Sequence, residues 1–289
     1  MKVPFQFQKT GKQSGFTMVE IAISLGVIGF ALVAIIGILP AGMKVQKENR
    51  EETIINQDAK MLLDAIKSGA RGLDDLTNYV VAITNFVTDY DGAFKPGNAP
   101  LKIGFTRTNS TLTPSFPINS GARIIGLLST PKYISLGANR RGLPFFRSNF
   151  VVAYVRALSG TANEKVPQTN SAVQELGFNY RVDIDVVPYA SYDPFSTNYN
   201  PQVAVTPQDR VDHFNNFLVA QALQNNVHDV RLIFRYPLLP NGNVGGGFQV
   251  YRTMVGGQLL PVQPILSLTN LYFFQPHTFF QTNTFVNSP

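Results

Sequence analysis

The chain has 289 residues, of which 44% are hydrophobic, so it can bury a core and is not disordered throughout. It contains no cysteine, which excludes disulfides, thiolate metal sites and a cysteine nucleophile. Its formal net charge is +6 at pH 7, and three of the positive charges lie within the first twelve residues.

The N-terminal region predicts a membrane span. Residues 21–43 are 23 uncharged positions, which as a helix measure about 34 Å against a bilayer core of roughly 30 Å. Lys2, Lys9 and Lys12 precede the span without any acidic residue, and such an excess marks the cytoplasmic side. We therefore expect residues 1–15 in the cytoplasm and the bulk of the chain outside, in a single-pass topology.

Two simpler interpretations of this region remain open. A secretory signal peptide has a basic start and an apolar run, but here the run is too long, contains Glu20 and lacks an A-x-A cleavage pattern. A plain membrane anchor has no use for Glu20, because a carboxylate in a lipid-facing helix costs up to about 2.5–3.5 kcal/mol at mid-bilayer. The glutamate therefore predicts a partner within the membrane.

A cut just before Phe16 would create such a partner. The new α-amino group would be cationic and one helical turn from Glu20, so the two groups can pair. The positive end of the helix dipole favours the same carboxylate. A partner from a neighbouring subunit would serve equally well, and Glu20 would then set the register between packed helices.

The segment GFTMVE at residues 15–20, after a lysine-bearing leader and before the apolar run, resembles the type III signal of type IV pilins and type II secretion pseudopilins. In that family a membrane peptidase cuts after the glycine and methylates the new N-terminal phenylalanine. The resemblance, which covers residues 9–70, implies that Gly15 precedes the cut, that Phe16 is methylated, and that Glu20 acts in subunit docking.

The resemblance also implies a function, a location and partners. We expect a minor pilin or pseudopilin subunit of a type IV pilus or type II secretion machine, held in the inner membrane and then assembled into a filament. Its partners would be other subunits, the prepilin peptidase and an inner-membrane assembly platform. A leader of 15 residues and a mature chain of 274 favour a minor component, and without cysteine the disulfide loop of adhesive pilins is excluded. The rival function is a stand-alone membrane-anchored binding protein of the envelope.

We expect a leader at 1–15, the transmembrane half of one helix at 16–43, its amphipathic half at 44–70, and a globular head at 71–289. In the amphipathic half, the pair Lys44 and Glu48 has helical spacing. One apolar stripe then predicts packing on a sheet. The stripe consists of Ile55, Ala59, Leu62 and Ile66. We expect a kink or break at Pro40 and a helix end at Gly69 or Gly72.

The head predicts an α+β, pilin-like fold in which the long helix packs on an antiparallel sheet with long loops. Residues 180–186 alternate apolar and charged side chains, as a half-buried strand does. Residues 229–236 and 248–254 predict a hairpin around the loop 237–247, and 149–157 is a further strand.

One helix and several loops complete the predicted head. The apolar positions Val211, Phe214, Leu218 and Ala222 predict an amphipathic helix with Asp209 as its cap. The polar stretches 104–121, 159–172 and 188–208 predict surface loops.

The remaining motifs favour no enzyme and no cofactor. His213, His228 and His277 lack the spacing of metal ligands, so we expect no metal site from them. The glycine run 242–247 lies between two strands, which favours a hairpin turn over a phosphate loop. The segment 89–92, DYDG, has oxygen ligands for calcium but only two aspartates.

Residues 92–163 form a basic block, with nine Lys and Arg and no acidic residue. One interpretation is a surface for DNA or an anionic glycan, with the adjacent Arg140 and Arg141 as contacts. The alternative, which we favour, is that the block faces the acidic segments on either side of it, within one head or across subunits.

Overall fold

The structure is a computed structural model. It describes residues 15–69, 73–90, 101–106, 115–138, 144–159, 177–189, 206–262 and 270–275. The chain divides into two compact units, Met1–Arg50 and Glu51–Pro289, and each is described by itself. The class is α+β, with a long N-terminal apolar helix and a sheet that is almost wholly antiparallel.

Helix α1 spans Met18–Ser68, which confirms the predicted long helix. It ends where Gly69 adopts a φ of +57°, a conformation that favours glycine, so the predicted stop signal is confirmed. Of the kink or break expected at Pro40, the break was wrong, because α1 continues through this residue, and the kink stays a prediction. A proline removes one backbone hydrogen bond, and the hydrogen bonds of the neighbouring turns are enough to keep this turn helical.

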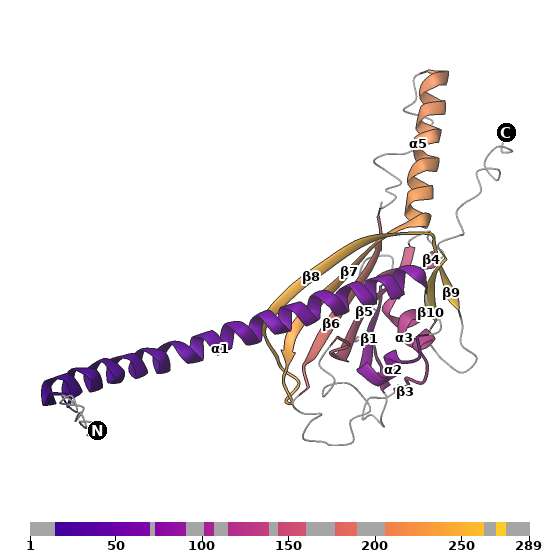
Figure 1. Ribbon diagram of the computed structural model, residues 1–289. Helices are drawn as coiled ribbons and strands as arrows, with labels where there is room; N and C mark the ends of the chain where they lie inside the picture. The colour runs from indigo at the N-terminus through magenta and orange to yellow at the C-terminus, as the bar shows by residue number, and fades with distance from the viewer. Residues whose placement is uncertain are drawn as a thin grey trace, which may run out of the picture. The chain divides into compact units, whose positions relative to one another are not determined.

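The second unit is built on a sheet of eight described strands (Figure 1). Their order is β3-β2-β1-β5-β6-β7-β8, with β4 beside the first part of β5. Every described pair is antiparallel except β2 with β3, which is parallel. The strands are β1 Val80–Tyr90, β2 Leu101–Thr106, β3 Ser115–Pro117, β4 Tyr133–Ala138, β5 Pro144–Arg156, β6 Asn179–Pro188, β7 Val227–Leu238 and β8 Val244–Gly256.

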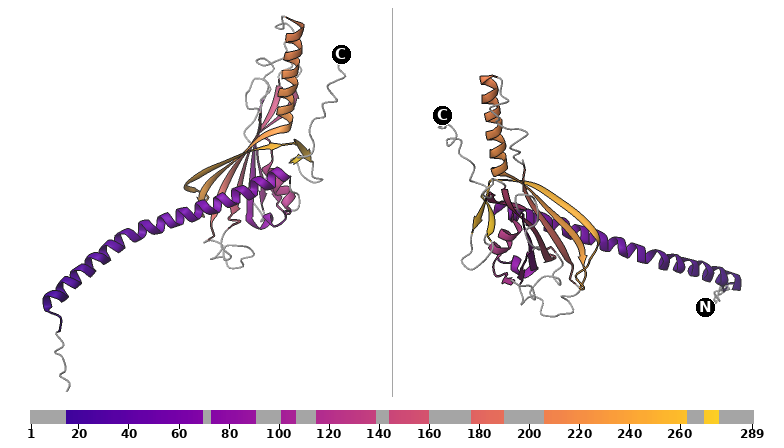
Figure 2. Two further views of the ribbon diagram at one scale, coloured as in Figure 1. Left: turned by 45° about the horizontal axis from the view of Figure 1, so that its top comes forward. Right: turned by 180° about the vertical axis from the view of Figure 1, so that it is seen from behind.

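The other elements are short helices and a two-stranded sheet. They are α2 Leu76–Tyr79, α3 Gly121–Leu128, α5 Pro207–Asn226, β9 Gln258–Val262 and β10 Leu271–Gln275. The last turns of α1, together with α3 and the β9–β10 pair, lie on one face of the main sheet (Figure 2).

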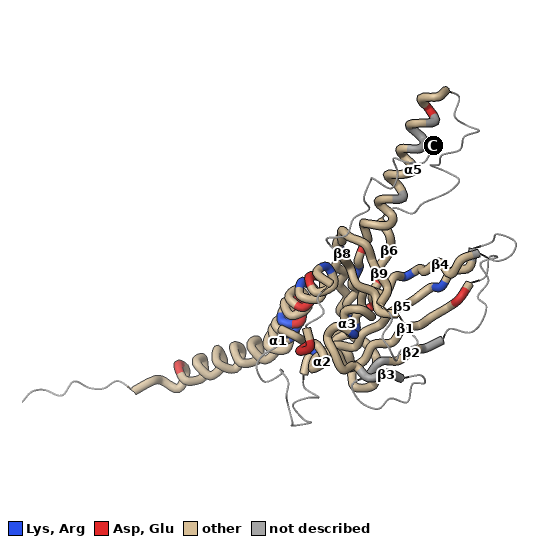
Figure 3. The backbone as a smooth tube through the Cα atoms, turned by 90° about the vertical axis from the view of Figure 1, so that its right-hand side faces the viewer, with Lys and Arg blue, Asp and Glu red and all other residues tan. Residues whose placement is uncertain are grey.

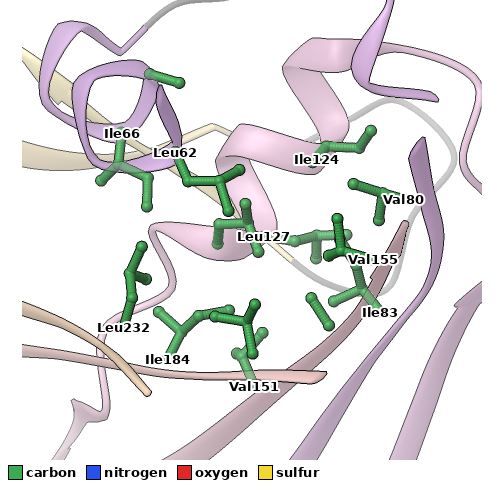
Figure 4. Packing of buried hydrophobic residues seen from close by; sticks show 14 of the residues in the cluster. Leu62, Ile66, Val80, Ile83, Ile124, Leu127, Val151, Val155, Ile184 and Leu232 are labelled. Atoms are coloured by element: carbon green, nitrogen blue, oxygen red, sulfur yellow. The ribbon is translucent and has the colours of Figure 1, made fainter. Parts of the chain in front are cut away.

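The core lies between that face of the sheet and the helices. The predicted stripe of α1 is confirmed, since Ile55, Ala59, Leu62 and Ile66 are all buried. Figure 4 shows Leu62 and Ile66 pointing toward Leu127 of α3 and toward sheet residues such as Ile184 and Leu232. Burying side chains of this size contributes about 1.5–3 kcal/mol each.

The predicted strands 149–157 and 180–186 are confirmed by β5 and β6, and the predicted hairpin is confirmed by β7 and β8. The hairpin's loop is shorter than expected, because Gly245 and Gly247 lie inside β8. A Cβ atom on Gly247 would come within 2.5 Å of the Tyr236 ring, so these glycines let the two strands approach closely.

The other sheet face carries buried carboxylates between arginines. Asp229 accepts hydrogen bonds from Arg231 and Arg252, at 2.6 and 2.7 Å. Burial alone would raise the pKa of Asp229, but these two hydrogen bonds outweigh it and lower the pKa below its ordinary value. Asp183, a charged position of the alternation predicted for 180–186, is buried in the same way between Arg181 and Arg235, so the charged positions of that strand do not all face solvent.

Three expectations for the head need correction. The stretch 104–121 is not one loop, because it holds the end of β2, all of β3 and the first residue of α3. The cap of α5 is Thr206 rather than Asp209; Asp209 is the third helical residue and completes a capping box with it. The amphipathic packing of α5 was wrong at Val211, which is exposed.

Candidate functional site

The candidate processing site lies directly before α1. Gly15 and Phe16 are exposed and precede the first helical residue, Met18. A Cβ atom added to Gly15 would meet nothing within 4 Å, and the Phe16 side chain is 84% exposed. The Gly15–Phe16 peptide bond therefore lies in exposed chain outside the helix, where a peptidase can reach it.

Glu20 closes a capping box at the start of α1. Its carboxylate accepts hydrogen bonds from the backbone N–H of Thr17 at 2.7 Å and from the Thr17 hydroxyl at 2.8 Å. In return, the backbone N–H of Glu20 donates to the Thr17 hydroxyl at 3.3 Å. The motif T-x-x-E at residues 17–20 indicates this capping box, and the part played by Thr17 was not among the predictions.

The apolar half of α1 has no buried residue before Glu51 in the described chain. By length and composition α1 is able to cross a membrane, although a signal sequence meets the same criteria. In the sequence Glu20 is the only charged residue of 15–43. Figure 3 shows a long stretch of the α1 tube without charged residues. Charges resume at Lys44, whose ammonium lies 3.7 Å from the Glu48 carboxylate, as the spacing predicted.

The second half of α1 is fixed to the sheet by a buried carboxylate. Asp58 is fully buried and accepts hydrogen bonds from the backbone N–H groups of Leu158 and Ser159, both at 2.8 Å. The Ser159 hydroxyl and the Tyr180 hydroxyl donate to the same carboxylate. Burial, and then the Asp58 charge, raise the pKa of Tyr180 well above its ordinary value, so this hydroxyl stays a donor.

The basic block is partly neutralised within the head. Arg147 donates two hydrogen bonds to Asp89, at 2.7 and 2.9 Å, and the pKa of Asp89 is lowered by them. The Lys132 ammonium lies 3.0 Å from the Asp185 carboxylate. Both acids come from the segments that flank the block, which confirms the favoured interpretation for these two cations.

The predicted polyanion contacts Arg140 and Arg141 lie outside the described residues. The same holds for His277 and for the last two residues of the candidate calcium segment, while its first residue, Asp89, is engaged by Arg147. His228 is buried in the core beside Phe274, with 5.4 Å between ring centroids. The described residues contain no group of three or more potential metal ligands.

Among the described residues, the junction at Gly15 is exposed and the apolar half of α1 buries no side chain, while residues 51–68 of α1 pack within the second unit. No family model, curated protein or solved structure matches this chain. The roles implied for Gly15, Phe16 and Glu20 by the pilin resemblance therefore stay predictions.

Proposed function

We propose that this chain is a minor pilin or pseudopilin, cut between Gly15 and Phe16, methylated on Phe16 and assembled into a filament. The observation that carries the proposal is the segment 15–20, an accessible glycine–phenylalanine junction followed by a glutamate at the start of a membrane-length helix. In the proposed role the chain catalyses no reaction. It works by holding and then exchanging helix contacts.

In the membrane, the apolar half of α1 would hold the subunit with its N-terminus in the cytoplasm and its head outside. In the filament, the exposed apolar side chains of 18–43 would pack against the same helix of neighbouring subunits. Glu20 would then pair with the cationic Phe16 amino group of an adjacent subunit. The prepilin peptidase and an assembly platform would act on the chain before this step.

Processing is the first test. Mass spectrometry of the protein from its native host should show an N-terminus at Phe16 with one added methyl group. Gly15→Val should leave the leader attached, while Gly11→Val, a glycine change four residues upstream, should be cut normally. An N-terminus at Met1, or a cut beyond residue 40 as a signal peptidase would make, contradicts the proposal.

The role of the Glu20 charge is the second test. Because glutamine can also complete a capping box, Glu20→Gln keeps the contact to Thr17 and removes only the charge. We expect Glu20→Gln and Glu20→Ala both to be inserted and cut, yet largely absent from sheared filaments. Glu48→Gln, which removes an exposed charge from the same helix, is the matched control and should assemble normally.

Two other outcomes of this test have distinct meanings. Normal assembly of Glu20→Gln alone would show that the capping contact matters and the charge does not. The protein could also stay uncut in the membrane, with neither the unaltered chain nor any variant present in sheared filaments. That result would favour the stand-alone envelope binding protein.

A further inference from the structure

Two pairs of arginines lie on the sheet face opposite the core, here called the outer face. The first pair, Arg181 and Arg235, consists of directly opposite residues on β6 and β7. The second pair, Arg231 and Arg252, consists of directly opposite residues on β7 and β8. Like charges in such positions destabilise a sheet, because the two Cβ atoms are only about 4.5–5.5 Å apart. Each pair therefore requires a negative charge beside it.

One buried carboxylate lies at each pair and offsets only part of its charge. Asp183 accepts hydrogen bonds from both Nε atoms of the first pair, at 2.7 and 3.3 Å. Asp229 accepts from both Nε atoms of the second pair, at 2.8 and 2.7 Å. Two guanidinium groups and one carboxylate leave one positive charge in excess at each pair.

The remaining donors of the pairs are available to a ligand. In the hydrogen bonds among the described residues, Arg181, Arg235 and Arg252 donate only through Nε. Their side chains are 29%, 44% and 56% exposed. The terminal NH2 groups of a guanidinium are planar donors that match a carboxylate. Each pair can therefore bind a second carboxylate, supplied from outside the sheet.

The spacing and the neighbours of the pairs define the ligand that fits both. Arg231 and Arg235 are four residues apart on β7, so the pairs are separated by about 14 Å along the strand. Phe248, Val250 and Met254 of β8 lie beside them on the same face, and all three are exposed. A fitting ligand has widely spaced carboxylates with apolar ring faces between them, as a polysaccharide with uronic acid units does.

The charge of the outer face favours such a polymer over a nucleic acid. A protein that binds a nucleic acid through its backbone typically neutralises about 6–10 phosphates and gains much of its affinity in this way. The two arginine pairs supply only one excess positive charge each. A polymer with few, widely spaced anions matches this arrangement better than one with an anion on every unit.

We propose that the outer face binds an anionic polysaccharide through the carboxylates of two of its uronic acid units. One carboxylate accepts from the first arginine pair and the other from the second. The apolar faces of the sugar rings contact Phe248, Val250 and Met254. The proposal concerns the second unit alone and adds a ligand that the proposed function does not use.

The test uses the purified full chain in detergent micelles, with empty micelles as the blank. The probe is a hexasaccharide of galacturonic acid, and calorimetry at low salt should show saturable binding. The same hexasaccharide with methyl-esterified carboxylates should bind at least about tenfold more weakly, because the arginine pairs then meet no anion. A thymidine hexanucleotide tests the rival ligand and should also bind more weakly than the hexasaccharide.

Variants assign the binding to the outer face. Arg235→Gln and Arg252→Gln each leave the buried carboxylate paired with the other arginine, and each should weaken hexasaccharide binding at least about tenfold. Lys60→Gln is the matched control, because Lys60 is an exposed cation on α1, which packs on the opposite face, and its binding should be unchanged. Val250→Glu places a negative charge between the pairs and keeps all four arginines. It should weaken binding relative to Val250→Gln even if the arginine variants fail to fold.

Four results would each overturn the proposal. They are the absence of saturable binding by the unaltered chain, equal affinity for the acid and its methyl ester, equal or tighter binding of the hexanucleotide, and equal affinity in folded Val250→Glu and Val250→Gln variants. None of them bears on processing at Gly15, so this proposal and the proposed function fail separately.

Discussion

His228 and Asp58 are both buried, yet their hydrogen bonding differs. The Asp58 side chain accepts hydrogen bonds from backbone and hydroxyl donors. The His228 ring packs against Phe274, its Nδ1 atom has no partner in the described chain, and burial lowers its pKa from 6.5 to about 4. The surroundings of His228 therefore favour its neutral form.

Lowering the pH should destabilise the head through His228. Between pH 6.5 and pH 4 the unfolded chain binds a proton at this histidine and the folded chain does not, so the free energy of unfolding falls as the pH falls. The full effect is ~3 kcal/mol. Urea denaturation, followed by circular dichroism of the tyrosines since the chain has no tryptophan, measures it.

His228→Leu should remove most of this pH dependence. Asp89 and Asp229 do not account for a loss of stability between pH 6.5 and pH 4. Their pKa values are lowered in the folded state, so their contributions to the free energy of unfolding are lost only below pH 3.8. An equally steep fall between pH 6.5 and pH 4 in the variant would contradict the assignment to His228.

The contact between α1 and the sheet is the main feature at the scale of elements. The apolar stripe decides which face of α1 is buried, but apolar packing alone tolerates sliding along the helix axis. Asp58 restricts this motion, because its oxygens must meet Leu158, Ser159 and Tyr180 together. Asn56 adds a second polar contact, to the Tyr251 hydroxyl on β8.

Removing the Asp58 carboxylate should loosen this contact. Asp58→Ala leaves two backbone N–H groups and two hydroxyls buried without their acceptor, which should lower the free energy of unfolding by about 3 kcal/mol or more. Asp58→Asn keeps one acceptor oxygen and should cost less. The matched control is Asp64→Ala, an exposed position on the same helix, where we expect a change within about 0.5 kcal/mol. Equal losses for Asp58→Ala and Asp64→Ala would contradict this role.

At the scale of the whole molecule, the proposed cut after Gly15 would change the charge balance. It would remove three lysines and leave a net charge of +3 in place of +6. Lys132 and Arg147 of the basic block are already paired with Asp185 and Asp89. The segments of opposite charge thus meet in the folded head, although they are far apart in the sequence.

The absence of cysteine allows a direct measurement of topology. We expect Val219→Cys, an exposed position on α5, to react with a membrane-impermeant maleimide on intact spheroplasts. Ser14→Cys, in the leader of a chain kept uncut by Gly15→Val, should react only after the membrane is permeabilised. Labelling of Ser14→Cys on intact spheroplasts would contradict the proposed orientation, because it would place the N-terminus outside.

Several features could be predicted from the residues because they depend on local patterns. The extent of α1, its buried stripe, the end at Gly69 and the strands β6, β7 and β8 all follow from periodicity and from glycine chemistry. Helix α3 was missed because an eight-residue apolar run has no period long enough to separate helix from strand. The candidate processing site was found because its motif is contiguous.

By itself, the sequence determined the membrane-length helix, the candidate junction at Gly15 and the alternation of strand 180–186, since each depends on neighbours along the chain. Only the tertiary structure decided which distant groups meet: Asp58 with Tyr180, Lys132 with Asp185, and Arg156 beside Asn179. The physical reason is strand register. A shift of one residue would turn every side chain of a strand to the other face, and register is set by packing of the whole sheet rather than by any local pattern.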